Sequence, residues 1–184
     1  TSWVVFLGSL GVSFVGLVAL ESSQVFGGRS GNRMLSLPYM IAVGMGLHNL
    51  GEGLAIGASY ASGEYTLSAL LVAGFGLHNG TEGFGIVGAA GKTPMSWRDV
   101  FLLGLIAGLP TCVGTFLSGQ GVSSYFSICF YALAAGSLLY VVLSLTVMSY
   151  TATRRVQVAA GMFAGISLMY VTAMVLTLVS GVRS

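Results

Sequence analysis

Long runs of hydrophobic residues, broken by short polar stretches, follow one another along the whole chain. Six such runs lie at roughly 3–20, 39–60, 66–90, 100–118, 125–149 and 158–181. No alternation of apolar and polar positions with a period of two runs through them, and only helices or closed barrels satisfy a backbone in lipid. Each run is close to the about 20 residues that a helix needs to cross a bilayer. The pattern therefore predicts six transmembrane helices.

Composition supports a membrane environment. Of the 184 residues, 55% are hydrophobic and only 7% are charged, whereas soluble domains carry about 25% charged residues. So few charges cannot cover a surface that faces water. We therefore expect an all-α integral membrane protein, one polytopic domain whose main partner is the lipid bilayer. The net charge of +2 is too small to indicate binding of nucleic acid. Cys112 and Cys129 both lie in apolar runs and are expected to be small buried packing residues rather than a disulfide.

The basic residues predict the orientation of the chain. Six of the seven lie in the first, third and fifth loops: Arg29, Arg33, Lys92, Arg98, Arg154 and Arg155. The second and fourth loops contain no lysine or arginine. Because basic loops stay in the cytoplasm, both ends of this chain are expected on the non-cytoplasmic side.

A ten-residue motif occurs twice in the apolar runs. It reads GMGLHNLGEG at residues 44–53 and GFGLHNGTEG at residues 74–83. The two copies hold both histidines of the chain and two of its five acidic residues. Residues four apart share a helix face, so each histidine is expected to point the same way as the glutamate that follows it.

The depth of the motif suggests its chemistry. His48 and His78 each lie twelve residues from the outer end of a predicted helix, or about 18 Å at 1.5 Å per residue, near the middle of a bilayer core about 30 Å thick. A carboxylate at that depth costs several kcal/mol unless it is paired or bound to a cation. A mixed set of nitrogen and oxygen ligands suits Zn²⁺, Fe²⁺ or Mn²⁺. The candidate metal ligands are His48, Asn49, Glu52, His78, Asn79 and Glu82.

Two other interpretations of the motif remain open. A buried His–Glu pair is often only polar contact between helices, although two copies at one depth favour a shared cation. Two histidines on neighbouring helices are also typical of bis-histidine haem ligation. That interpretation would leave both glutamates and both asparagines without a role.

Glycine is abundant, with 28 residues, and four pairs are spaced four apart. The pairs are Gly53/Gly57, Gly76/Gly80, Gly104/Gly108 and Gly161/Gly165. Small residues at this spacing let the backbones of membrane helices approach closely. We expect most of these pairs to lie at tight helix–helix contacts.

The segments HNLGEG at 48–53 and HNGTEG at 78–83 resemble the fourth and fifth helices of the ZIP (Zrt/Irt-like protein) metal transporters, in which a repeated HN-x-P-E-G supplies the metal site. Further resemblance follows in AGLPTCVGTFLSG at 107–119, YALAAGSLLYVVL at 131–143 and AAGMFAGISLMYVTAMVL at 159–176, which are similar to the sixth, seventh and eighth family helices. The resemblance covers the third to eighth helices of an eight-helix fold, so the first two are expected to be missing here.

The resemblance implies transport of a divalent transition metal toward the cytoplasm, with no enzymatic step and no organic cofactor, the metal ion being the substrate. His48, Asn49 and Glu52 match the fourth-helix ligands, and the second motif copy matches the fifth-helix ligands. Where the family often has a glutamate and a proline in its sixth helix, this chain has Thr111 and Cys112, which become candidates for weaker ligands.

Some features depart from the family pattern. Gly51 and Thr81 stand at the two motif prolines, and the loop at 21–37 lacks the histidine run of many relatives. These departures and the missing helices favour a second hypothesis, in which the chain is a ZIP-derived structural subunit of a larger membrane complex without transport. A homodimer or other membrane subunits are the expected protein partners.

Overall fold

Six helices account for almost all of the described chain. The structure is a computed structural model that describes residues 2–23, 36–121, 123–152 and 155–180. Its helices are α1 (Ser2–Ser22), α2 (Ser36–Ala61), α3 (Tyr65–Gly88), α4 (Trp97–Gly119), α5 (Ser124–Ala152) and α6 (Arg155–Ser180). Each overlaps one predicted run, with ends that differ from the prediction by at most three residues. The described residues contain no strand, and the all-α class is confirmed.

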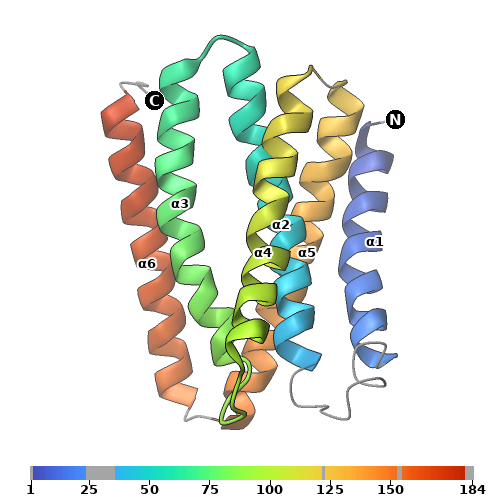
Figure 1. The fold of residues 1–184 in the computed structure, drawn as a ribbon, viewed down its shortest axis with the longest axis vertical. Helices are drawn as coiled ribbons and strands as arrows, with labels where there is room; N and C mark the ends of the chain where they lie inside the picture. The colour runs from blue at the N-terminus through green and yellow to red at the C-terminus, as the bar shows by residue number, and fades with distance from the viewer. Residues whose placement is uncertain (1, 24–35, 122, 153–154, 181–184) are drawn as a thin grey trace.

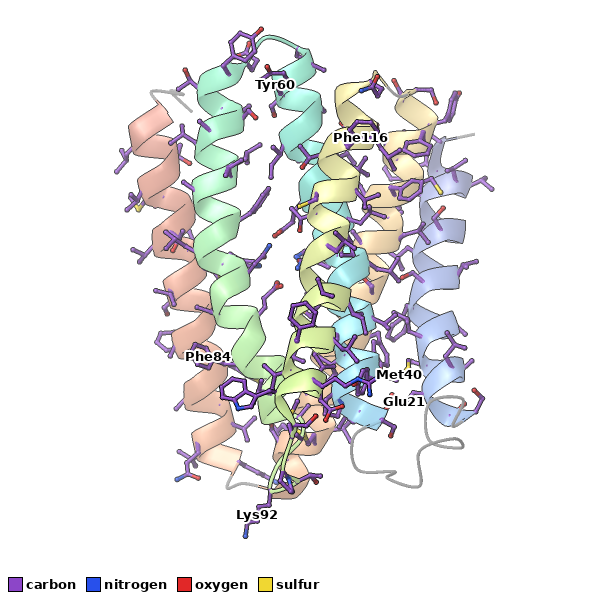
Figure 2. All side chains as sticks on the ribbon, in the orientation of Figure 1. Glu21, Met40, Tyr60, Phe84, Lys92 and Phe116 are labelled. Atoms are coloured by element: carbon purple, nitrogen blue, oxygen red, sulfur yellow. The ribbon has the colours of Figure 1, made fainter. Side chains whose placement is uncertain are left out.

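The helices run alternately up and down beside one another (Figure 1). The starts of α1, α3 and α5 and the ends of α2, α4 and α6 lie at one end of the bundle, and the opposite ends of the six helices lie at the other. Lys92 lies at the opposite end from Tyr60 (Figure 2). Arg98 and Arg155 begin helices at the same end as Lys92. The predicted loop residues Arg29, Arg33 and Arg154 lie outside the described residues.

Four of the described helices are long and apolar enough to cross a membrane: α1, α4, α5 and α6, with mean hydropathies of 2.2, 2.1, 2.1 and 1.8. The other two, α2 and α3, carry the polar residues of the repeated motif. Because α2 packs against α3, α4 and α5, Asn49 and Glu52 of the first motif copy are buried inside the bundle. The fold is thus an all-α membrane bundle in which α2, the helix with the first motif copy, lies at the centre.

The core forms around α2. Met40, Ile41 and Leu54 of this helix are almost completely buried, as are Tyr140 and Val141 of α5. The most extensive contact is between α2 and α4, whereas α1 packs mainly on α5 and α6 packs mainly on α3. The helix with the first motif copy, α2, is therefore the helix that is most enclosed by its neighbours.

Glycine permits the close contact between α2 and α4. A Cβ atom added at Gly53 would overlap the backbone carbonyl oxygen of Thr111, and one added at Gly57 would overlap that of Thr115. From the other side, a Cβ at Gly114 would overlap the carbonyl oxygen of Leu50. The two backbones are thus in direct contact, with no side chain between them.

The other three glycine pairs behave differently. A Cβ atom at Gly76, Gly80, Gly104, Gly108, Gly161 or Gly165 would meet no atom within 4 Å. The prediction of tight packing is therefore wrong for three of the four pairs within the described bundle. The spacing is the same in all four, but only the α2 pair faces a neighbouring helix.

Candidate metal centre

The two motif copies meet because α2 and α3 are antiparallel neighbours joined by a short turn. Each histidine lies one helical turn from its own glutamate, at spacing i, i+4. The antiparallel pairing brings the second histidine–glutamate pair opposite the first, near mid-helix in both cases. Four ionisable side chains then share one space between the helices.

The four side chains form a closed cluster, called the His–Glu cluster below. The Nε2 atom of His48 lies 3.6 Å from Oε1 of Glu52 and 3.9 Å from Oε1 of Glu82. The Nε2 atom of His78 lies 3.7 Å from Oε1 of Glu52 and 3.0 Å from Oε1 of Glu82. Each imidazole thus faces both carboxylates rather than its own partner alone.

These separations are suited to a shared ion. Ligand atoms of His48, Glu52 and His78 all lie within 4.8 Å of one another. Two ligands held about 2.1 Å from a tetrahedral Zn²⁺ are separated by about 3.4 Å. The observed distances of 3.0 to 3.9 Å bracket that value. Small side-chain adjustments would therefore allow His48, Glu52 and His78 to reach one cation, with Glu82 lying 3.0 Å from His78.

Both carboxylates of the cluster are largely buried. The side chains of Glu52 and Glu82 are only 6% and 10% exposed. Their Oε2 atoms are buried without a hydrogen-bond partner among the described residues. A buried oxygen that lacks a partner destabilises the protein, and a bound cation would satisfy it. The donor set therefore fits a divalent transition metal.

The geometry is unfavourable for haem. Both imidazole Nε2 atoms contact both carboxylates, and the two ring centroids are 6.1 Å apart with a tilt of 50°. A porphyrin placed between the imidazoles would also separate each histidine from a carboxylate that it contacts. The cluster in its present form is better suited to a bare ion.

The two asparagines have different surroundings. Asn49 is buried, and its Nδ2 atom donates a hydrogen bond of 3.1 Å to the carbonyl oxygen of Ala107 in α4. Asn79 contacts the carboxyl group of Glu52 through its side chain. The Oδ1 atoms of both asparagines are buried without a hydrogen-bond partner. Asn79 therefore belongs next to the cluster, while Asn49 ties α2 to α4.

Comparison with characterised proteins identifies a relative of this chain. The chain is 34% identical over 131 residues, 69% of its length, to a human protein. That relative is zinc transporter ZIP4 [Homo sapiens]. The match supports a relationship to the ZIP family, although the aligned region spans only 20% of ZIP4. No family model matches the chain, and no solved structure matches it.

The positions of the ZIP motif prolines have local explanations here. Gly51 gives α5 room, since a Cβ atom there would lie 2.7 Å from Cβ of Ala134. The hydroxyl of Thr81 donates a hydrogen bond of 2.6 Å to the carbonyl oxygen of His78. Such bonds from threonine to the preceding turn often bend a helix, and α3 curves in its lower half (Figure 1). Both helices are continuous through the motif without proline.

The two candidates for weaker ligands lie on α4. Cys112 is an exposed free thiol outside the His–Glu cluster, so the expectation that it is buried is wrong. Thr111 lies where α4 contacts Gly53, and its Oγ1 atom is buried without a partner.

The other cysteine, Cys129, lies in α5. It is half-buried and accepts a hydrogen bond from Ser9.

A cavity of about 370 Å³ reaches the cluster from the side of α5. Its lining includes His48, Glu52, Phe75 and Tyr131. Phe75 precedes His78 by three residues in α3, and Tyr131 is the eighth residue of α5, so both lie on the side of the cluster that is nearer the α2–α3 turn. No motif in the sequence identifies these aromatic residues, because the cavity depends on how α5 packs against α2.

Proposed function

We propose that this chain is a ZIP-family protein that moves a divalent transition metal, Zn²⁺, Fe²⁺ or Mn²⁺, across the membrane toward the cytoplasm. The single observation that supports it most is the closed cluster, in which two imidazole Nε2 atoms each lie within 3.9 Å of two carboxylate oxygens. The similarity to ZIP4 supports the same function. No covalent step is needed, so the protein is not expected to be an enzyme.

The order of the ligands suggests a route for the ion. Because α2 and α3 are antiparallel, Glu52 lies toward the α2–α3 turn and Glu82 lies toward the opposite end. The cavity lined by Phe75 and Tyr131 would admit the ion to His48 and Glu52 first. Glu82 and His78 would then release it on the other side. The ligands would be His48, Asn49, Glu52, His78, Asn79 and Glu82.

The direction follows from the proposed orientation. Lys92, Arg98 and Arg155 lie at one end of the bundle, opposite the α2–α3 turn. The positive-inside rule favours placing that end in the cytoplasm. The start of α1 and the end of α6 would then lie on the non-cytoplasmic side. Labelling of a cysteine introduced at Glu64 or at Lys92 by an impermeant reagent tests this, and reaction only at Lys92 from outside would contradict it.

Elemental analysis of the purified protein, together with titration by Zn²⁺, Fe²⁺ and Mn²⁺, tests the metal site. We expect near-stoichiometric binding of at least one of these ions. A metal-free chain that binds none of them and co-purifies with stoichiometric partner subunits would instead favour the structural-subunit hypothesis. A Soret band in the visible spectrum would favour haem.

Metal affinity should weaken as pH falls. An imidazole binds a metal only when it is neutral, and a carboxylate only when it is ionised. Four such groups form the cluster, so protons compete with the ion at each of them. Isothermal titration with Zn²⁺ should give a markedly weaker affinity at about pH 5.5 than at about pH 7.5, on either side of the usual range of histidine titration. An affinity that does not change with pH would contradict ligation by the histidines.

A further inference from the structure

Two consecutive helices enclose a cavity near one end of the bundle. The end of α5 and the start of α6 lie at the end that holds Lys92 (Figures 1 and 2). Although they follow each other in the chain, α6 packs mainly on α3 and contacts α5 little. A cavity of about 430 Å³ lies between α5 and α6 and is lined by residues of these two helices. None of the lining residues belongs to the His–Glu cluster, so this is a separate site.

Three polar side chains line the cavity, those of Thr146, Ser149 and Gln157. Within the described part of the chain, none of the three side chains has a hydrogen-bond partner. Other hydroxyl groups of the bundle do have one, since those of Thr115 and Thr172 donate to the carbonyl oxygen four residues earlier, at 2.9 Å. A polar group without a partner is unfavourable in a membrane. The three side chains are therefore available to a ligand.

Polarity falls with depth in the cavity. Ser149 lies three residues before the end of α5 and Gln157 two residues after the start of α6, about 3 to 5 Å from the helix ends at 1.5 Å per residue. The lining about 9 to 11 Å from those ends is mainly apolar, with Leu145, Gly161 and Met162 beside Thr146. The cavity thus has a polar mouth and a mainly apolar floor, as an amphipathic ligand requires.

A positive charge lies beside the mouth. Arg155 is the first residue of α6 and is exposed. Residues three and seven apart share a helix face, so Arg155 lies on the face of α6 that carries Val158 and Met162, two of the lining residues. None of the lining residues is acidic. The mouth therefore suits the head of an anionic ligand.

We propose that this cavity binds an anionic phospholipid, with its phosphate at the mouth and an acyl chain against the floor. Hydroxyl, amide and guanidinium groups all donate hydrogen bonds to phosphate oxygens. Basic pockets between membrane helices on the cytoplasmic side bind lipid head groups, and the orientation proposed above places this end in the cytoplasm. A free phosphate ion would leave the floor unused, because Gly161 and Met162 carry no side-chain donor. The ligand is distinct from the metal, and its binding does not depend on transport.

Native mass spectrometry of the detergent-solubilised chain, with phosphatidylglycerol and phosphatidylcholine added in equal amounts, tests the site. We expect the chain to retain phosphatidylglycerol in preference. Gly161→Leu fills the cavity without a clash, since a Cβ atom there meets nothing within 4 Å, and it should abolish this preference. Gly165→Leu is the matched control, because Gly165 is open in the same way, one turn further along α6, but does not line the cavity. Equal losses in the two variants would overturn the location.

Changes at the mouth test the contacts to the head group. Arg155→Gln should lower the preference for phosphatidylglycerol about fivefold, the contribution of one basic residue near a membrane surface. Arg98→Gln removes the same charge at the same end of the bundle but from α4, and it should have a smaller effect. Equal effects would indicate attraction to the surface charge in general and would overturn the site.

A double variant, Thr146→Val with Ser149→Ala, removes both hydroxyl groups of the lining. It should also bind less phosphatidylglycerol, with the helical content from circular dichroism unchanged. Retention of this lipid at the original level in both Gly161→Leu and the double variant would overturn the proposal.

Two further outcomes would assign the cavity to another ligand. Inorganic phosphate should not displace a fluorescent phosphatidylglycerol from the chain, and displacement would indicate a site for the free ion. Loss of zinc uptake in Gly161→Leu with phosphatidylglycerol still bound would place the cavity on the path of the metal. The lipid measurements use no metal, so they decide this proposal even if the chain does not transport.

Discussion

Changing His48 to Ala or Glu82 to Ala is expected to abolish uptake of Zn²⁺ into vesicles reconstituted with this protein. Each change removes one of the four groups that face one another in the His–Glu cluster. Since each imidazole lies within 3.9 Å of both carboxylates, removing one group takes a partner from two others. Uptake, measured with a zinc-sensitive dye inside the vesicles, should fall to the level of protein-free vesicles.

A control separates loss of the ligand from loss of negative charge. Glu64 lies exposed in the α2–α3 turn, next to the start of α3, and Glu64→Ala should leave uptake unchanged. Glu82→Gln keeps the size of the side chain while removing its charge, and it should fail as Glu82→Ala does. Helical content from circular dichroism should be the same in all variants. Transport at the original rate in both His48→Ala and Glu82→Ala would remove the proposed function.

Adding one methyl group at Gly53 is expected to destabilise the bundle strongly. The new Cβ atom would overlap the carbonyl oxygen of Thr111 and lie 2.9 Å from the Thr115 nitrogen. Both are backbone atoms, so α2 and α4 must move apart instead of a side chain changing its rotamer. Overpacking of this kind costs about 1–3 kcal/mol or more. Thermal unfolding of the detergent-solubilised Gly53→Ala variant should therefore show a lower midpoint.

The second motif copy supplies the matched control. Gly83 occupies the position that Gly53 has in the first copy, yet a Cβ atom there would meet nothing within 4 Å. Gly83→Ala should shift stability by no more than about 0.5 kcal/mol, as is usual for sites without close contacts. Equal destabilisation by the two changes would show that the α2–α4 contact is not as close as described here. A neutral Gly53→Ala would show the same.

The sequence predicted the features that depend on local spacing. Hydrophobic runs predicted six helices, and the i, i+4 spacing placed His48 with Glu52 and His78 with Glu82. The equal distance of both histidines from one end of their helices predicted that they would meet, because a short turn makes α2 and α3 antiparallel neighbours. These inferences need only the helical rise and one tight turn, which is why they could be drawn without coordinates.

Other features depend on which helices are neighbours. The repeat treats Asn49 and Asn79 alike, but α4 adjoins only the first copy closely, so Asn49 bonds to Ala107 while Asn79 stays beside Glu52. For the same reason Gly53 lies against the backbone of α4, whereas a Cβ atom at Gly83 would meet no atom within 4 Å. The two copies of the motif therefore have different roles.

By itself, the sequence determined the all-α membrane class, the repeated histidine and glutamate pairs and their common depth, because hydrophobicity and helical periodicity act along one segment at a time. Only the tertiary structure decided that both imidazoles face both carboxylates and that α4 touches the first motif copy. Those contacts arise between helices that are distant in the chain. Their partners are selected by packing of the whole bundle, which no local pattern encodes.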